Sequence, residues 1–214
     1  MTLVTFPIVA AVIALSNNMI NILYGPNYQP SILYVQILML NFLFIGLGSN
    51  INGILLKSQK RTDINFKTTI IYIIIGIPLG LILIPKYGIL GFLATTIFAP
   101  KLGLFYSIYW INKNLGITLD YPTIGKITLS TIVSYIACII TVRLVSLNLW
   151  IELILGGIVL MITYLISILI TGAINEKNLY DIKRITEKNK LGKTLAGPIL
   201  KVLIKIVNTH QKHT

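Results

Sequence analysis

Long apolar stretches, separated by short polar connections, fill most of the chain. A helix needs about 20 mainly apolar residues to cross the hydrocarbon core of a bilayer, and six segments reach this length. They are too long for barrel strands and lack alternation of apolar and polar residues. The pattern therefore predicts an all-α integral membrane protein. The predicted membrane domain, residues 1–172, has spans at residues 3–23, 32–56, 66–84, 89–110, 124–144 and 149–171.

The sequence changes after Gly172, because residues 173–214 are strongly basic. Leu179, Ile182 and Ile185 recur at three-residue spacing among basic residues, and a similar pattern follows closer to the C-terminus. This periodicity favours basic amphipathic helices lying on an anionic inner leaflet; a frayed, solvated tail is the alternative. The basic residues predicted to contact the membrane surface are Lys183, Arg184, Lys201 and Lys205.

The distribution of Lys and Arg predicts the orientation, because cytoplasmic loops are enriched in both. Alternate connections must lie on the same side of the membrane. The connection at residues 57–67, the connection with Lys113 and Lys126, and the tail together carry fifteen Lys and Arg residues, whereas the other connections carry two. The first set, including the C-terminus, is therefore predicted to be cytoplasmic. The uncharged hinge at residues 21–30 is predicted to face outward.

Composition supports the membrane assignment and narrows the classes of function. The chain is 55% hydrophobic and only 11% charged, with a net charge of +12. Because the positive charge lies in the connections and the tail, we expect it to face lipid headgroups and not nucleic acid. A single cysteine, Cys138, excludes an intrachain disulfide and a thiolate metal site. Phosphate-loop, metalloprotease and hydrolase motifs are missing, so we predict no enzyme activity, no cofactor and no metal.

Lys101 is the ionisable residue placed deepest in a predicted span. A charge at this depth is costly and usually faces a cavity or a partner. Lys101 is therefore a candidate for contacting the phosphate or carboxylate of a ligand in a water-filled cavity; the alternative is a lysine that snorkels or pairs within the bundle. Arg143 and Glu152 flank an outer turn, where we expect an interfacial ion pair between neighbouring helices.

Uncharged polar residues concentrate in the second predicted span. Gln36 and Asn50 are fourteen residues apart, close to four helical turns, and would share one face of a continuous helix. Such a polar stripe either lines a translocation path or hydrogen-bonds to a neighbouring helix. Both residues are candidates for lining a substrate cavity. In the third predicted span, GIPLG at residues 76–80 matches a helix-contact motif of small residues.

Three short motifs give the chain a family resemblance. The first is LYG-x-x-Y at residues 23–28, and the third is LIP-x-x-G-x-x-G at residues 83–91. Between them, LKSQKR at residues 56–61 stands where the family often has a Gly-Lys pair. With these motifs the sequence resembles the C-terminal part of polysaccharide-biosynthesis flippases. These are the O-antigen and lipid-linked-oligosaccharide transporters of the multidrug/oligosaccharidyl-lipid/polysaccharide exporter superfamily.

The resemblance implies a multi-pass transporter of the cell membrane, built from two lobes that alternate access to a central cavity. This chain would form one lobe, and an N-terminal lobe would be missing. The implied substrate is a lipid-linked glycan, and Lys101 would offset the charge of its phosphate. A multidrug or metabolite exporter of the same superfamily is one alternative. A non-transporting scaffold subunit of a glycan-synthesis complex is another.

Overall fold

The computed structural model describes residues 2–44, 48–117, 120–145 and 148–173, without the side chains of residues 49–51. All regular structure in these ranges is helical, as the sequence predicts. The elements are α1 (Thr2–Leu23), the 3₁₀ turn η1 (Pro26–Tyr28), α2 (Pro30–Phe42), α3 (Ser49–Ser58), α4 (Thr62–Tyr87), α5 (Ile89–Leu115), α6 (Tyr121–Val145) and α7 (Leu149–Ile170).

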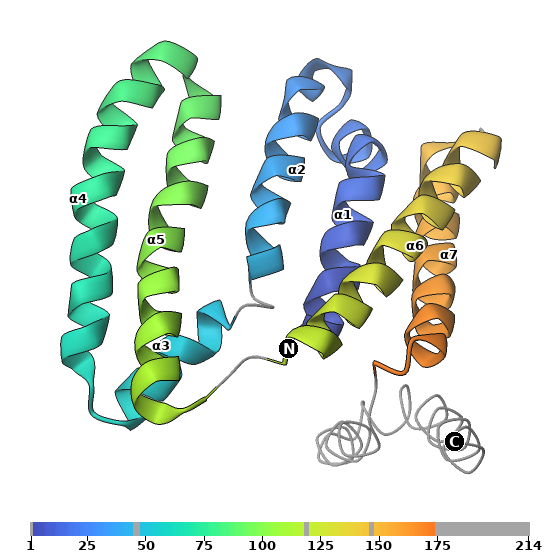
Figure 1. Ribbon diagram of the computed structural model, residues 1–214. Helices are drawn as coiled ribbons and strands as arrows, with labels where there is room; N and C mark the ends of the chain where they lie inside the picture. Colours follow the sequence, from blue (N-terminus) through green and yellow to red (C-terminus); the bar gives the residue numbers. More distant parts are fainter. Residues whose placement is uncertain (1, 45–47, 118–119, 146–147, 174–214) are drawn as a thin grey trace, which may run out of the picture.

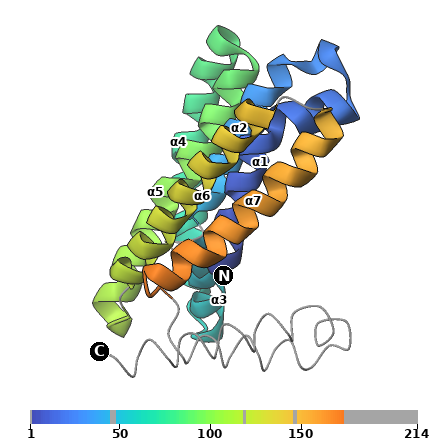
Figure 2. The same ribbon diagram turned by 90° about the vertical axis from the view of Figure 1, so that its right-hand side faces the viewer.

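The helices form two groups that lie side by side (Figure 1). In one group α4 and α5 form an antiparallel hairpin, and the short helix α3 packs at its lower end. In the other group α1 packs against α2, α6 and α7. Figure 2 views this second group from its outer side, with α7 in front of α1. Contacts between α2 and α5 join the two groups.

The connections fall into two sets at opposite ends of the bundle. The α1–α2 hinge, the α4–α5 turn, the end of α6 and the start of α7 lie at the upper end in Figure 1. The α3–α4 loop, the end of α5, the start of α6 and the end of α7 lie at the lower end. This arrangement agrees with the alternation expected from the order of the spans. Which end faces the cytoplasm stays a prediction that rests on the distribution of Lys and Arg.

The structure divides the second predicted span, so a single continuous helix over residues 32–56 is wrong. α2 ends at Phe42 and α3 begins at Ser49. Gly48, directly before α3, has a φ of 77°, a left-handed conformation that glycine adopts without steric cost. With 13 and 10 residues, neither helix reaches across a bilayer by itself at about 1.5 Å per residue.

Within the described residues, five helices are long and apolar enough to cross a membrane. They are α1, α4, α5, α6 and α7, and they match the other predicted spans. Many of their apolar side chains point outward; Ile74, Ile77 and Leu81 of α4, for example, are 59–72% exposed. Such a surface is stable in contact with lipid chains and not with water.

Small residues bring α4 and α5 into close contact, as the GIPLG motif predicts. Gly76 of this motif is buried, and a Cβ added to it would lie 3.3 Å from the Cβ of Ala99. Near the turn, a Cβ on Gly91 would overlap the carbonyl oxygen of Leu83. The two backbones therefore approach closely, which is how membrane helices gain packing contacts.

A second packed core joins α1, α6 and α7. Ala10 and Leu15 of α1 contact Cys138 of α6 and Leu160 of α7 in one buried cluster. Gly156 of α7 lies against it, because an added Cβ would be 2.8 Å from Leu15 Cδ2 and 3.3 Å from Cys138 Sγ. The lone cysteine is therefore part of the packing between helices.

Candidate ligand-binding site

Lys101 lies near the middle of α5, twelve residues after Ile89, which is about 18 Å along the helix. Its Nζ donates a hydrogen bond of 2.6 Å to Oδ1 of Asn41 in the last turn of α2. The same Nζ lies 4.2 Å from the ring centroid of Phe44, in cation–π contact. An ammonium group has three N–H donors. Since the described residues hydrogen-bond one of them, the others can reach a ligand.

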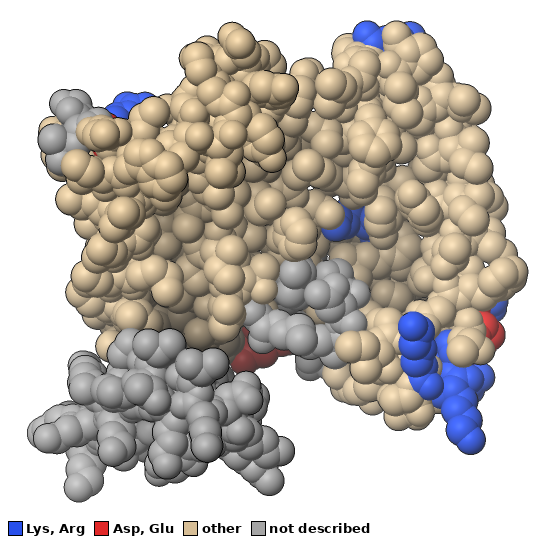
Figure 3. All heavy atoms as spheres, turned by 180° about the vertical axis from the view of Figure 1, so that it is seen from behind, with Lys and Arg blue, Asp and Glu red and all other residues tan. Residues whose placement is uncertain are grey.

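The surface seen from behind is hollowed between the two helix groups (Figure 3). Basic side chains gather at the ends of the bundle, and a basic side chain also shows in the hollow at mid-height. Among the Lys and Arg residues on described helices, Lys101 is the one near the middle of its helix. A half-buried cation is therefore accessible at mid-height, well separated from the charges at the two ends.

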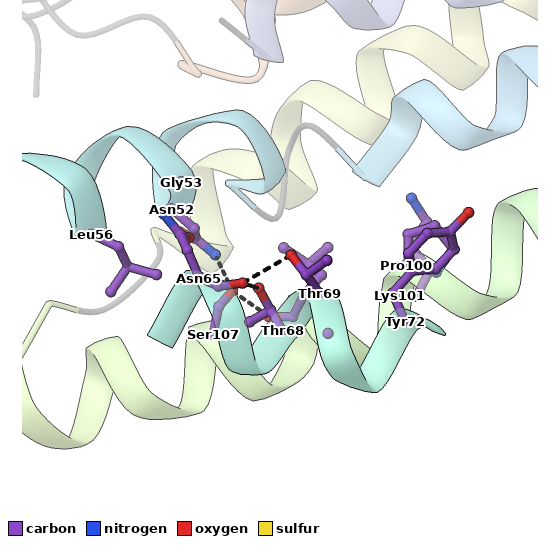
Figure 4. Close-up of a pocket in the computed structure, with 12 residues that line it drawn as sticks. Asn52, Gly53, Leu56, Asn65, Thr68, Thr69, Tyr72, Pro100, Lys101 and Ser107 are labelled. Carbon is purple, nitrogen blue, oxygen red and sulfur yellow. Dashed lines mark hydrogen bonds between the residues drawn. The ribbon is translucent and has the colours of Figure 1, made fainter. Parts of the chain in front are cut away.

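A pocket of about 290 Å³ extends from Lys101 between α3, α4 and α5. Its lining divides into two ends along α4 and α5 (Figure 4). At one end Lys101 and Tyr72 direct their polar tips the same way, beside Pro100. The other end is polar but uncharged. Its side chains come from Asn52 of α3, Asn65, Thr68 and Thr69 of α4, and Ser107 of α5.

Hydrogen bonds hold the uncharged end in place. Asn52 is 8% exposed, and its Nδ2 donates a bond of 3.3 Å to Oγ of Ser107, which ties α3 to α5. The hydroxyls of Thr68 and Thr69 donate bonds of 2.7 and 3.0 Å to the backbone oxygen of Asn65. The half-buried side chain of Asn65 has no hydrogen bond within the described residues. Its amide is therefore available to a ligand.

Gln36, one of the two candidates from the second predicted span, does not line this pocket. Its Nε2 donates a hydrogen bond of 2.8 Å to Oγ of Ser16 and a longer one of 3.4 Å to the backbone oxygen of Ile13 in α1. Gln36 thus connects neighbouring helices, the alternative considered for the polar stripe. Asn50 belongs to α3, and its side chain is outside the described part. Because the helix is interrupted between them, Gln36 and Asn50 do not share a helix face.

The predicted ion pair between Arg143 and Glu152 is not formed among the described residues. Arg143 is exposed near the end of α6. Glu152 instead accepts a hydrogen bond of 2.7 Å at Oε2 from Nδ2 of Asn18, which is 2% exposed. This amide also donates a bond of 3.4 Å to the carbonyl oxygen of Leu149. A buried amide of α1 thus satisfies the carboxylate of α7 in place of the arginine.

The residues predicted to contact the membrane surface, Lys183, Arg184, Lys201 and Lys205, lie outside the described residues, together with the tail from residue 174 onward.

Sequence reasoning did not identify Asn41 or the uncharged end of the pocket as parts of the site. Asn41 is recognisable as a polar residue in an apolar segment, but its pairing with Lys101 depends on how α2 meets α5. Asn65 and Thr68 lie at the start of α4, beside the basic connection, where polar residues are common at a membrane surface. No local signal distinguishes them from ordinary interfacial residues.

No family model matches the chain, and no solved structure matches it. Over 172 residues the chain is 27% identical to an uncharacterized membrane protein, MJ1068, of Methanocaldococcus jannaschii. The matched segment covers 79% of this chain and 32% of that protein, so the chain spans about a third of the relative's length. With the five apolar helices, this similarity decides the broad class. The chain is a multi-pass membrane protein.

Proposed function

We propose that this membrane protein is part of a transporter that flips lipid-linked oligosaccharide or polysaccharide precursors across the cytoplasmic membrane. The observation that carries the proposal is Lys101, a cation midway along a membrane helix and at one end of a polar pocket. A charge at this depth costs free energy, which a bound anion would offset. The motifs that resemble those of polysaccharide-biosynthesis flippases support a glycan substrate.

The mechanism that fits this arrangement is alternating access, in which the polar head group passes through a cavity while the lipid tail stays in the bilayer. Lys101 would bind the phosphate through the N–H donors that Asn41 does not use. The interruption between α2 and α3 lies beside this pocket, since Phe44 contacts Lys101 and Asn52 lines the pocket. Non-helical backbone is tolerated at membrane depth where protein or a water-filled cavity surrounds it.

Reconstitution tests the proposal. The complete transporter, with this chain as one of its two lobes, is inserted into vesicles that contain a polyprenyl-diphosphate oligosaccharide with a fluorophore on its glycan, and a membrane-impermeant quencher reports transfer between leaflets. We expect Lys101→Ala to lower the initial rate roughly tenfold, which corresponds to about 1.4 kcal/mol. Lys101→Arg should keep most of the rate because the positive charge remains. The matched control is Lys86→Ala, an exposed lysine at the upper end of α4.

Three results would contradict the proposal. One is a rate with the complete native transporter equal to that of protein-free vesicles. A second is an unchanged rate in the Lys101→Ala variant, which would show that Lys101 takes no part in transport. The third is equal transfer of a fluorescent phosphatidylcholine, which would show that the protein scrambles lipids without selecting the glycan.

A further inference from the structure

We infer that the uncharged end of the pocket between α3, α4 and α5 binds a sugar, while Lys101 binds the phosphate attached to that sugar. The pocket would thus hold one glycosyl phosphate along its length. The inference rests on the proposed function for the role of Lys101 and adds a sugar subsite, built from Asn52, Asn65 and Thr68. A bound sugar would explain why the end of the pocket away from Lys101 is polar although no charged residue lines it.

The spacing along the two long helices fits such a ligand. Ser107 follows Lys101 by six residues on α5, which is about 9 Å. Asn65 precedes Tyr72 by seven residues on α4, which is about 10 Å. The two helices run side by side, so the cationic and uncharged ends are separated by a similar distance on both walls (Figure 4). A phosphate joined to a sugar ring extends over a comparable length.

The hydrogen-bonding groups left over at the uncharged end suit sugar hydroxyls, which both donate and accept. Asn65 offers its complete amide, with two N–H donors and a carbonyl acceptor. Asn52 uses an N–H toward Ser107 and keeps its carbonyl oxygen. The Thr68 hydroxyl donates within α4, so its oxygen can still accept. Donors and acceptors are therefore mixed, whereas a site for an anion would present mainly donors.

The charge and the volume of the pocket also fit a sugar at its uncharged end. Lys101 is the charged residue among those that line the pocket, so the uncharged end gives no ionic contact to a second phosphate. The pocket of about 290 Å³ has the volume of about ten water molecules, enough for a sugar ring. Ligand sites of this kind combine apolar walls with a few placed polar groups, and here Leu56 and Leu104 supply the apolar part.

Binding measurements on the purified full chain in detergent test the subsite without requiring transport. The probes are a short-chain prenyl phosphate, the same compound carrying one hexose on the phosphate, and phosphatidylinositol. Microscale thermophoresis gives each Kd for the native protein, Asn65→Leu and Lys101→Ala. Asn112→Leu is the matched control, because Asn112 is exposed on α5 at the same end of the bundle and outside the pocket lining.

We expect the hexose to tighten binding to the native protein about tenfold. Asn65→Leu should remove this gain and leave prenyl phosphate binding unchanged, and Asn112→Leu should keep it. Lys101→Ala should weaken both prenyl compounds. Because the side chain of Asn65 has no hydrogen bond within the described residues, its replacement should not unfold the protein, which circular dichroism checks.

Several outcomes would overturn the subsite. These are no gain from the hexose, an equal loss for both prenyl compounds in Asn65→Leu, or the same loss in Asn112→Leu. If phosphatidylinositol binds as tightly as the prenyl glycoside and depends equally on Asn65, the ligand is a bilayer phospholipid and the glycan assignment falls. If Lys101→Ala abolishes flipping but Asn65→Leu leaves the hexose gain intact, the proposed function stands and the sugar subsite does not.

Discussion

The Nζ of Lys101 and the Oδ1 of Asn41 lie 2.6 Å apart and join α5 to the last turn of α2. This bond crosses between the two groups of helices, where α2 contacts α5. It also holds the cation in the polar pocket. We therefore expect this contact to affect stability and, under the proposed function, ligand binding as well.

Removing the partner of Lys101 should destabilise the protein. We expect Asn41→Leu to lower the free energy of unfolding by about 1–3 kcal/mol, because a hydrogen bond to a charged group is lost and the cation stays within the bundle. Thermal unfolding in nanodiscs measures the change. The double variant Asn41→Leu with Lys101→Met should recover much of the loss, since replacing both partners by apolar groups can be nearly neutral. A double variant as unstable as the sum of the single variants would show that the two residues are not coupled.

Two substitutions distinguish the hydrogen bond between Asn18 and Glu152 from the ion pair that was expected between Arg143 and Glu152. Asn18→Leu should lower stability by about 1–3 kcal/mol, because the half-buried carboxylate loses its hydrogen-bond donor. Arg143→Ala should change stability by less than about 0.5 kcal/mol, as is usual for an exposed residue. Unfolding of both variants is compared under identical conditions. A larger effect of Arg143→Ala than of Asn18→Leu would restore the ion pair as the principal contact.

Glycine positions distinguish close packing from open surface. Gly91→Ala should destabilise the α4–α5 hairpin by about 1–3 kcal/mol, because the added methyl group meets the backbone of Leu83 and the helices must separate. Gly157→Ala is the control, since nothing lies within 4 Å of its Cβ position. It should be neutral or slightly stabilising because alanine favours a helix. Equal stabilities of the two variants, measured by thermal unfolding, would argue against the close approach at Gly91.

We expect the stability of the first turn of α6 to depend on pH through Asp120. Its carboxylate accepts hydrogen bonds from the Thr123 hydroxyl at 2.6 Å and from the Thr123 backbone N–H at 3.2 Å, and these bonds lower the pKa of Asp120 below its usual value. A carboxyl group whose pKa is lowered by folding stabilises the folded state at neutral pH. This stabilisation is lost as the pH falls through the lowered pKa.

Amide hydrogen exchange in the first turn of α6 measures this effect. Protection should decrease on acidification in the native protein. In Asp120→Ala it should already be reduced at neutral pH and change less with pH, because the carboxylate that accepts the hydrogen bonds of Thr123 is missing. Asp120→Asn keeps an acceptor oxygen without the titration, so it should hold its protection across the same range. An acid-induced loss of protection in Asp120→Asn as large as in the native protein would refute the assignment.

The sequence by itself determined the membrane class, the positions of five long helices and the small-residue contact at Gly76. Each depends on local composition: about 20 apolar residues are required for a span, and glycine at a helix surface permits close approach. Lys101 was recognisable for the same reason, because a charge in an apolar stretch is conspicuous without any knowledge of its neighbours.

Only the tertiary structure decided which polar groups meet. An apolar segment does not reveal that its helix is interrupted, because the break at Gly48 depends on a backbone angle and not on hydropathy. Likewise Glu152 was expected to pair with a nearby arginine in sequence, but the packing of α1 against α7 brings Asn18 to it from 134 residues away. Hydrogen bonds require atoms within about 3 Å, and the relative placement of helices that sets such distances arises from packing along their whole length.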